Sequence, residues 1–228
     1  MSNIITMKTF IDPRVINIFT DASVYQNGNE FISSHGFYCP TTNESFSQVV
    51  RMSSNNKGEL MGIRDGILYA ISKRSEYQQI NIWSDSLYSV KSICEWFPKW
   101  YMNSVNGVLY NNNNKEINNQ NILNEIITLI LSNNLRVNII HQRGHIIEKV
   151  KMSDAIKSFK IANNMMITED AMFNAATCNQ IIDELTRNQF LTKNILDIPI
   201  YKCPMNLLFL NIDVKRLLIL TRKTGDLE

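Results

Sequence analysis

Four carboxylates that lie far apart in the sequence are the residues with the clearest chemical potential. They are Asp21, Glu59, Asp85 and Asp183. Carboxylates that are brought together disfavour one another's charge, and bound divalent cations remove that conflict. Mg²⁺ prefers carboxylate oxygens, and two such ions can stabilise the attacking water and the leaving 3′ oxygen of a phosphodiester displacement. The alternative is that these acids, like most of the 21 in the chain, are solvated surface groups.

Two short apolar segments are expected to carry two of these acids to one place. Residues 15–20 alternate apolar and polar side chains and lead into Asp21, and residues 79–84 form a buried type of strand that leads into Asp85. If the two strands are adjacent and parallel, Asp21 and Asp85 meet at one edge of the sheet.

The remaining elements are expected to complete a mixed sheet covered by helices. Strands are also predicted over 31–39, 45–52 and 135–141, and helices from about residue 57 to 71 and over 86–97, 121–131 and 179–188. The first three strands would form an antiparallel meander, after which strands and helices alternate. This order predicts an α/β fold with a five-stranded mixed sheet. The first helix would aim Glu59 at the sheet edge, and the last would carry Asp183.

The chain is expected to form one main domain with additions. We assign residues 1–14 to an N-terminal arm, 15–194 to the domain and 195–228 to a C-terminal extension of unknown role. Residues 146–178 form an insertion that is charged, mostly helical in pattern and without an obvious partner face.

Composition allows a real core and excludes several classes of protein. Of the 228 residues, 44% are hydrophobic and 19% are charged, which argues against wholesale disorder. The net charge of +2 is too small for a strongly basic nucleic-acid binder, so any such contact must come from a local patch. The four scattered cysteines predict free thiols in a reducing compartment, with a disulfide or zinc site as the alternative.

No targeting or membrane segment is expected. The N-terminus lacks the order of a signal peptide, and the apolar stretch 207–220 is interrupted by charges and too short to cross a bilayer. We therefore expect an intracellular, cytoplasmic monomer, or one in a nucleic-acid-containing compartment of the host if the chain is viral.

Five motifs in sequence order give the chain a family resemblance. They are IFTDAS at 18–23, SSNNKGELMGI at 53–63, IWSDSLYSVKSICEW at 82–96, HQRGHI at 141–146 and NQIIDELTRN at 179–188. Together they resemble the motifs of the type 1 ribonuclease H family, in a phage-like or viral-like form with a long insertion before the last aspartate. The resemblance implies a ribonuclease H-like fold.

The resemblance also implies roles for the acids and for one histidine. Asp21, Glu59, Asp85 and Asp183 would bind two Mg²⁺ ions, for which Mn²⁺ can substitute. Asp85 would also help to position the attacking water. His145 would move protons or assist product release, since a histidine changes charge near neutral pH. The alternative for His145 is a loop histidine without a role, and His141 on the preceding strand is expected to be structural.

The fourth carboxylate has a competitor. The family usually has a short loop between the histidine and the last aspartate, but here 37 residues separate His145 from Asp183. Asp154 lies at nearly the usual spacing. We favour Asp183, because the flanking Asn179 and Arg187 match the family motif whereas the sequence around Asp154 does not.

Two groups of residues are expected to hold nucleic acid. The resemblance places Ser54, Asn55, Asn56 and Ser86 at positions that contact the minor groove or a DNA phosphate. Helix capping is the alternative for the two asparagines, and both roles are compatible. Trp96, Lys99 and Trp100 resemble an aromatic and basic handle that grips DNA. For Trp96 the alternative is core packing.

The expected function is hydrolysis of the RNA strand of an RNA–DNA hybrid by a metal-dependent endonuclease that leaves 5′-phosphate and 3′-hydroxyl ends. One alternative is another nuclease of the same fold, such as a resolvase or an exonuclease. A second is an inactive module that only binds the hybrid.

Overall fold

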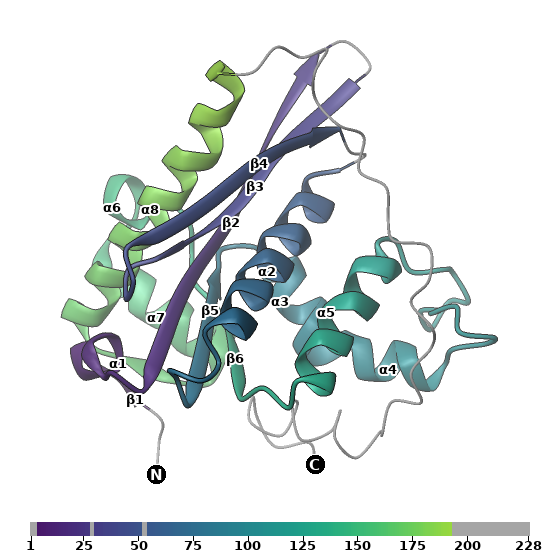
Figure 1. Cartoon of the computed structure of the whole chain (residues 1–228), viewed down its shortest axis with the longest axis horizontal. Coiled ribbons are helices and arrows are strands. Elements are labelled where there is room, and N and C mark those ends of the chain that lie inside the picture. Colours follow the sequence, from purple (N-terminus) through teal and green to yellow (C-terminus); the bar gives the residue numbers. More distant parts are fainter. Residues whose placement is uncertain (1–3, 28–29, 52–53, 193–228) are drawn as a thin grey trace.

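The fold is built on a central five-stranded sheet in a computed structural model that describes residues 4–27, 30–51 and 54–192 (Figure 1). The expected C-terminal extension at 195–228 lies outside the described residues. The strands are β2 (Val15–Asn27), β3 (Glu30–Cys39), β4 (Glu44–Arg51), β5 (Gln79–Ser84) and β6 (Val137–His141). Their order is β4-β3-β2-β5-β6, with β2, β3 and β4 antiparallel and β2, β5 and β6 parallel. The predicted mixed sheet is therefore confirmed.

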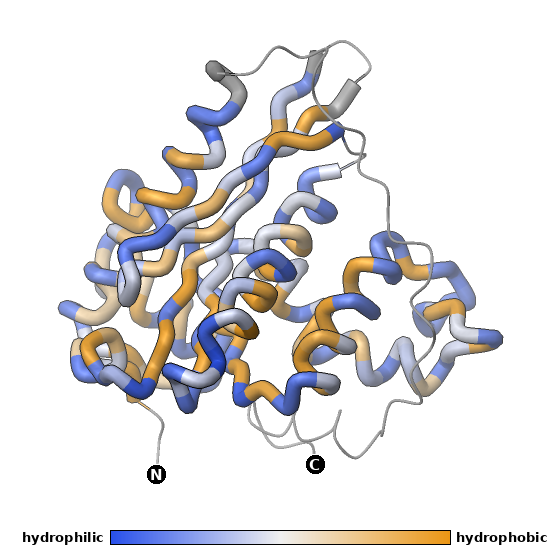
Figure 2. The backbone as a smooth tube through the Cα atoms, viewed as in Figure 1, coloured by the Kyte–Doolittle hydropathy of each residue, from blue (hydrophilic) through white to orange (hydrophobic). Residues whose placement is uncertain are grey.

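Helices cover both faces of this sheet (Figure 1). One face is covered by α2 (Asn55–Ser72) and α5 (Gln120–Ser132). The other is covered by α1 (Met7–Ile11), α6 (Ile146–Lys149), α7 (Met152–Asn163) and α8 (Glu169–Thr192). A bent helical segment follows β5 and consists of α3 (Leu87–Lys91), the π-helical turn η1 (Ser92–Trp96) and α4 (Phe97–Met102). Figure 2 shows apolar residues along the lower half of β2 and along α5.

The core under α2 and α5 is largely aliphatic. Its fully buried side chains include Ile18, Leu60, Ile63, Ile67 and Ile126. These residues lie at the helical and strand spacings that the sequence predicted, because one apolar face of each element must leave water.

The core on the opposite face contains an aromatic stack to which α1 and the insertion contribute. Trp83 of β5 stacks on Phe19 of β2 with ring centroids 5.4 Å apart, on Phe10 of α1 at 5.5 Å and on Phe159 of α7 at 6.1 Å. Phe159 belongs to the insertion, which therefore has a well-defined partner face that the sequence did not reveal.

The N-terminal arm is tied to the insertion by a second, two-stranded sheet. Strand β1 (Ile4–Ile5) pairs in parallel with β7 (Met166–Ile167). Ile5 and Ile167 are buried in the aromatic core described above. Both segments therefore join the same core as α8.

Two helices differ from their predicted bounds. The last one was expected over 179–188, but α8 begins ten residues earlier, at Glu169. Its early buried residues Ala171 and Ala175 are small, so the sequence shows little apolar contrast there. The helix predicted over 86–97 does not stop at Pro98, because this proline lies in the first turn of α4, where a missing N–H costs no hydrogen bond.

A row of asparagine side chains crosses the three parallel strands. Asn138 donates a hydrogen bond to Asn81 at 2.9 Å, and Asn81 donates one to Asn17 at 3.0 Å. The Trp83 indole also donates to the Asn17 oxygen, and the Asn17 amide donates to the main-chain oxygen of Thr9. The row is thus hydrogen-bonded at its Asn17 end to the chain just before β2.

Two further properties bear on the sequence predictions. Within the described ranges no helix is long and apolar enough to cross a membrane. Cys39, Cys94 and Cys178 are free thiols, as predicted, and Cys203 lies outside the described residues.

Candidate active site

Asp21 and Asp85 meet where the parallel pairing of β2 and β5 ends. The last paired residues are Thr20 and Ser84, and each is followed directly by one of the aspartates. Asp21 was expected at the end of its strand. That expectation was wrong, because β2 continues to Asn27 through antiparallel pairing with β3. The expected juxtaposition with Asp85 nevertheless holds, since it depends on the parallel pair alone.

Glu59 reaches the same point from α2, which lies very close to the sheet. A Cβ atom added at Gly62 would lie 3.1 Å from the Asp21 carbonyl oxygen and 3.2 Å from that of Gly36. A side chain at this position would require the helix or the strands to shift by a few tenths of an ångström. The helix therefore holds Glu59 against the sheet, with 6% of the residue exposed.

The three carboxylates form a compact set of oxygen donors. One oxygen each from Asp21, Glu59 and Asp85 can be chosen so that all lie within 4.8 Å of one another. Among the described residues, Glu59 Oε2 is buried and accepts no hydrogen bond. A buried anionic oxygen without a donor is costly, and a hard cation held by carboxylates would satisfy it. The donor set thus fits a divalent metal ion.

Burial and mutual repulsion control the electrostatics of this set. Burial raises the pKa of Asp21 well above its usual range, and the charges of Asp85 and Asp183 raise it further. The pKa of Glu59 is also raised well above its usual range, first by burial and then by Asp21 and Asp85. Burial and Asp183 raise the pKa of Asp85, although a hydrogen bond from Asn179 opposes this.

Asp183 lines the same open cleft but stands outside the compact set. The cleft is lined by Asp21, Asn55, Glu59, Asp85, Ser86, His145, Asp183 and Arg187, among others. Asp183 Oδ2 lies 2.8 Å from an Arg187 guanidinium nitrogen one helical turn further along α8. Asp154 lies on the exposed start of α7 and is not among the residues that line the cleft.

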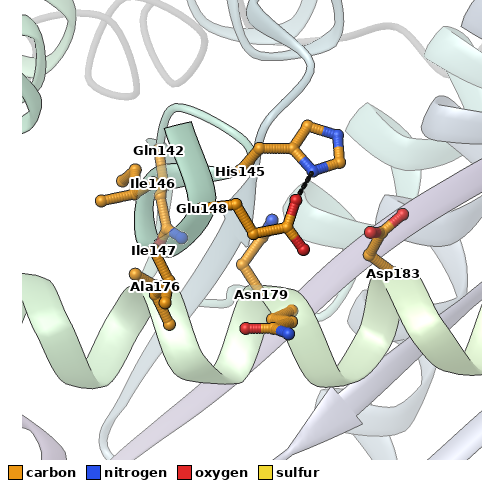
Figure 3. Close-up of a pocket in the computed structure, with 9 residues that line it drawn as sticks. Gln142, His145, Ile146, Ile147, Glu148, Ala176, Asn179 and Asp183 are labelled. Carbon is orange, nitrogen blue, oxygen red and sulfur yellow. Dashed lines mark ion pairs between the residues drawn. The ribbon is translucent and has the colours of Figure 1, made fainter. Parts of the chain in front are cut away.

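His145 overhangs the cleft from the loop after β6. It has a left-handed backbone (φ 54°) and is the N-cap of α6. Its Nδ1 lies 3.8 Å from a carboxylate oxygen of Glu148, and Figure 3 shows this pair beside Asn179 and Asp183 of α8. The imidazole is 41% exposed, so it is accessible from the cleft.

Two residues at the site were identified in the sequence only as flanking matches. Asn179 is buried and hydrogen-bonds Asp85, and Arg187 forms the ion pair with Asp183. The i,i+4 spacing of Asp183 and Arg187 could have predicted their pair. Thr186 was missed altogether: it is buried, and its hydroxyl lies 3.4 Å from Asp21 Oδ2.

The expected nucleic-acid contacts fall into two separate places. Asn55 and Ser86 line the carboxylate cleft, and Asn55 also hydrogen-bonds Glu59. Ser54 is the N-cap of α2 but makes no side-chain capping bond, and Asn56 is exposed.

The expected handle lies elsewhere. Trp96, Lys99 and Trp100 lie on η1 and α4, on the side of the molecule away from α8, and none of them lines the cleft (Figure 1). The Trp96 and Trp100 rings are 5.7 Å apart, and Trp100 packs partly against the aliphatic core.

Comparison with known proteins assigns the family. The family model described as RNase H matches residues 13–155, which is more than half of the chain. The chain belongs to the RNase H family. It is therefore a nuclease of the hydrolase class with the RNase H-like fold. The match includes Asp21, Glu59, Asp85 and His145 and ends before Asp183.

Solved structures of RNase H proteins resemble the chain distantly. A foamy viral protease–reverse transcriptase in complex with dsDNA is 18% identical with a TM-score of 0.46, covering 66% of this chain and 90% of that one. RNase H1 from the archaeon Halobacterium salinarum is 12% identical with a TM-score of 0.39, covering 57% and 86%. LC11-RNase H1 in complex with an RNA/DNA hybrid is 15% identical with a TM-score of 0.39, covering 70% and 98%. A search of curated proteins found no match.

Proposed function

We propose that this RNase H-family chain is an endonuclease that hydrolyses the RNA strand of RNA–DNA hybrids with two divalent metal ions. The observation that carries the proposal is the convergence of Asp21, Glu59 and Asp85 within 4.8 Å, with Asp183 lining the same cleft. Family membership supports the same reaction.

The fourth carboxylate in this proposal is Asp183 rather than Asp154. Asp183 lies close enough to raise the pKa of Asp21 and of Asp85, whereas Asp154 lies outside the cleft. Its carboxylate forms an ion pair with Arg187 at the rim of the buried set. The four acids would hold Mg²⁺, or Mn²⁺ in its place.

The proposed reaction uses water as the nucleophile, so no nucleophilic side chain is needed. When bound, two metal ions supply the charge that stabilises the attacking water and the leaving oxygen. Asp85 orients the water, and His145 accepts or delivers a proton from the exposed rim. Attack of water on the phosphorus with breakage of the bond to the 3′ oxygen would leave 5′-phosphate and 3′-hydroxyl ends.

The cleft offers polar groups for a hybrid duplex. Asn55 and Ser86 lie beside the carboxylates, where amide and hydroxyl groups can bond the 2′-hydroxyls that distinguish RNA from DNA. Ser54 and Asn56 extend this contact along the start of α2. Trp96, Lys99 and Trp100 would form a separate contact with the DNA strand by stacking and phosphate neutralisation.

A cleavage assay with end-labelled nucleic acids tests the proposal. With Mg²⁺ or Mn²⁺, the protein should cut the RNA of a uniform hybrid and leave duplex DNA, duplex RNA and single strands intact. Product ends can be identified by whether phosphatase treatment is required before rephosphorylation at the 5′ end. Preferential cutting of branched DNA or of free ends would instead favour a resolvase or an exonuclease.

Asp85→Asn provides the matched inactive variant. It should abolish cutting while leaving hybrid binding, measured by fluorescence anisotropy, largely intact. An Asp85→Asn variant that cuts as fast as the parent would remove Asp85 from the metal set. A parent protein that binds the hybrid but never cuts it would favour the inactive binding module.

A further inference from the structure

The loop that closes the cleft behind Asp85 begins at the end of the edge strand β6. An edge strand exposes main-chain groups that need partners. At His141 these groups are satisfied by one side chain of the insertion: Asn163 Oδ1 accepts from the His141 N–H at 2.8 Å, and Asn163 Nδ2 donates to the His141 carbonyl at 2.8 Å. The same Nδ2 donates to the Phe159 carbonyl, which fixes the amide orientation. Asn163 therefore acts as a short strand partner for β6.

The His141 side chain connects the end of β6 to Asp85 in the cleft. Its Nε2 donates to the main-chain oxygen of Asp85 at 3.2 Å. A carbonyl oxygen can only accept, so the geometry requires the proton on Nε2. Among the described residues, the other ring nitrogen has no hydrogen-bond partner. The Asp85 contact is thus the one hydrogen bond of this imidazole within that part of the chain.

The following residues enclose Asp85 from the same side. The Gln142 N–H donates to the Ser84 carbonyl at 2.9 Å, and the Gln142 side chain donates to Ala175 of α8 at 3.1 Å. A Cβ atom added at Gly144 would lie 2.5 Å from Asp85 Oδ2. Asp85 therefore sits in a notch whose wall is held by β5, by α8 and, through His141, by the insertion.

We propose that His141 and Asn163 are positioning residues for Asp85: Asn163 fixes the end of β6, and His141 fixes the Asp85 main chain so that its carboxylate keeps the geometry needed for metal binding. The inference rests on the proposed function. It assigns the insertion a part in the site, since Asn163 lies at the end of α7. Groups that orient metal ligands generally affect metal affinity about 10–100-fold.

The test measures metal binding and catalysis separately. His141→Phe keeps a ring but removes the donor, and His141→Gln keeps an amide donor. Asn163→Asp keeps the acceptor for the His141 N–H but removes the donor to the His141 carbonyl. Ile161→Ala is the matched control, because Ile161 lies on the same helix and is 85% exposed. Mn²⁺ affinity is measured by calorimetry on the nucleic-acid-free protein, at a temperature where circular dichroism shows every variant folded.

We expect His141→Phe and Asn163→Asp to weaken Mn²⁺ binding by about tenfold or more. Both should lower kcat at fixed Mn²⁺ without changing KM for the hybrid. His141→Gln should recover most of the loss, and Ile161→Ala should match the parent. If either His141→Phe or Asn163→Asp binds Mn²⁺ with the affinity of the parent, the inference is overturned, even if that variant melts at a lower temperature. Asn163→Asp keeps the test decisive if His141→Phe fails to fold.

The outcome also separates this inference from the proposed function. A parent that cuts the hybrid alongside a His141→Phe variant of equal affinity and rate overturns only the positioning role. A parent that neither binds Mn²⁺ nor cuts the hybrid overturns both.

Discussion

The two helices that bring carboxylates to the cleft from opposite faces of the sheet hold them in different ways. Glu59 on α2 is buried, lies against the sheet and has one oxygen without a donor among the described residues. Asp183 on α8 is partly exposed and is paired with Arg187. Without metal, Glu59 therefore has a buried oxygen that lacks a hydrogen-bond donor, whereas Asp183 has a cationic partner.

The hydrophobic cores behind these two helices also differ in composition. The α2 face is an aliphatic core within the segment that matches the family. The α8 face depends on aromatic contacts from the arm and the insertion, through Phe10 and Phe159. The core behind Glu59 thus lies within the family match, whereas the α8 face is also stabilised by residues outside that match.

The largest expected effect tests whether the insertion supports the α8 face. Phe159→Ala removes a buried ring from the stack on Trp83 and should lower the free energy of unfolding by about 3–5 kcal/mol. Urea unfolding followed by circular dichroism measures the change. Ile161→Ala on the same helix should stay within about 0.5 kcal/mol. Equal, small effects would mean that the insertion packs only loosely on the domain.

The next effect tests whether the fourth metal-binding carboxylate is Asp183 on α8 or Asp154 on α7. Asp183→Asn should lower kcat more than about 100-fold, because changes in groups that merely support a metal ligand already cost about 10–100-fold. Asp154→Asn is the matched control and should cut hybrid at the parent rate, since it lies outside the cleft. The reverse result would transfer the fourth ligand to α7.

A smaller effect tests the close contact of α2 with the sheet. Gly62→Ala places a methyl group against two main-chain oxygens and should destabilise the fold by about 1–3 kcal/mol, despite the better helix propensity of alanine. Leu68→Ala, on the exposed side of α2, should change stability by about 0.5 kcal/mol or less. A Gly62→Ala variant as stable as the parent would show that α2 can move away from the sheet.

The smallest effect tests the electrostatic difference between the two acids. Because the pKa of Glu59 is raised in the folded protein, the folded chain binds more protons than the unfolded chain between about pH 4 and that raised pKa. The free energy of unfolding of the metal-free protein should therefore fall as the pH rises from about pH 4 to the raised pKa and then level off. Glu59→Gln should reduce this fall and raise the melting temperature at neutral pH in EDTA.

The same measurement on Asp183→Asn provides the contrast. This variant relieves the repulsion of Asp21 and Asp85 but also loses the Arg187 ion pair, so it should raise the melting temperature less than Glu59→Gln does. Stabilisation by Asp183→Asn equal to that by Glu59→Gln would contradict the difference between the two faces.

The sequence predicted the parts of the molecule that depend on local pattern. Alternation in residues 15–20 and the buried type of strand at 79–84 predicted the two strands whose parallel pairing joins Asp21 to Asp85. The sequence indicated helical structure before residue 179 but not one helix continuous from Glu169, because the buried side of early α8 is lined by small residues such as Ala171. The contact of Phe10 with Trp83 and that of His141 with Asp85 join segments far apart in the chain, which no local pattern encodes.

The asparagine row across the parallel strands helps to fix where Asp21 and Asp85 lie relative to each other along the sheet. Asn17 and Asn81 are aligned partners, and each is followed four residues later by Asp21 or Asp85. A one-residue slip of β5 would break the hydrogen bonds of the row and shift Asp85 along the strand by about 3.3 Å. The row therefore favours the strand alignment that places the carboxylates of Asp21 and Asp85 side by side.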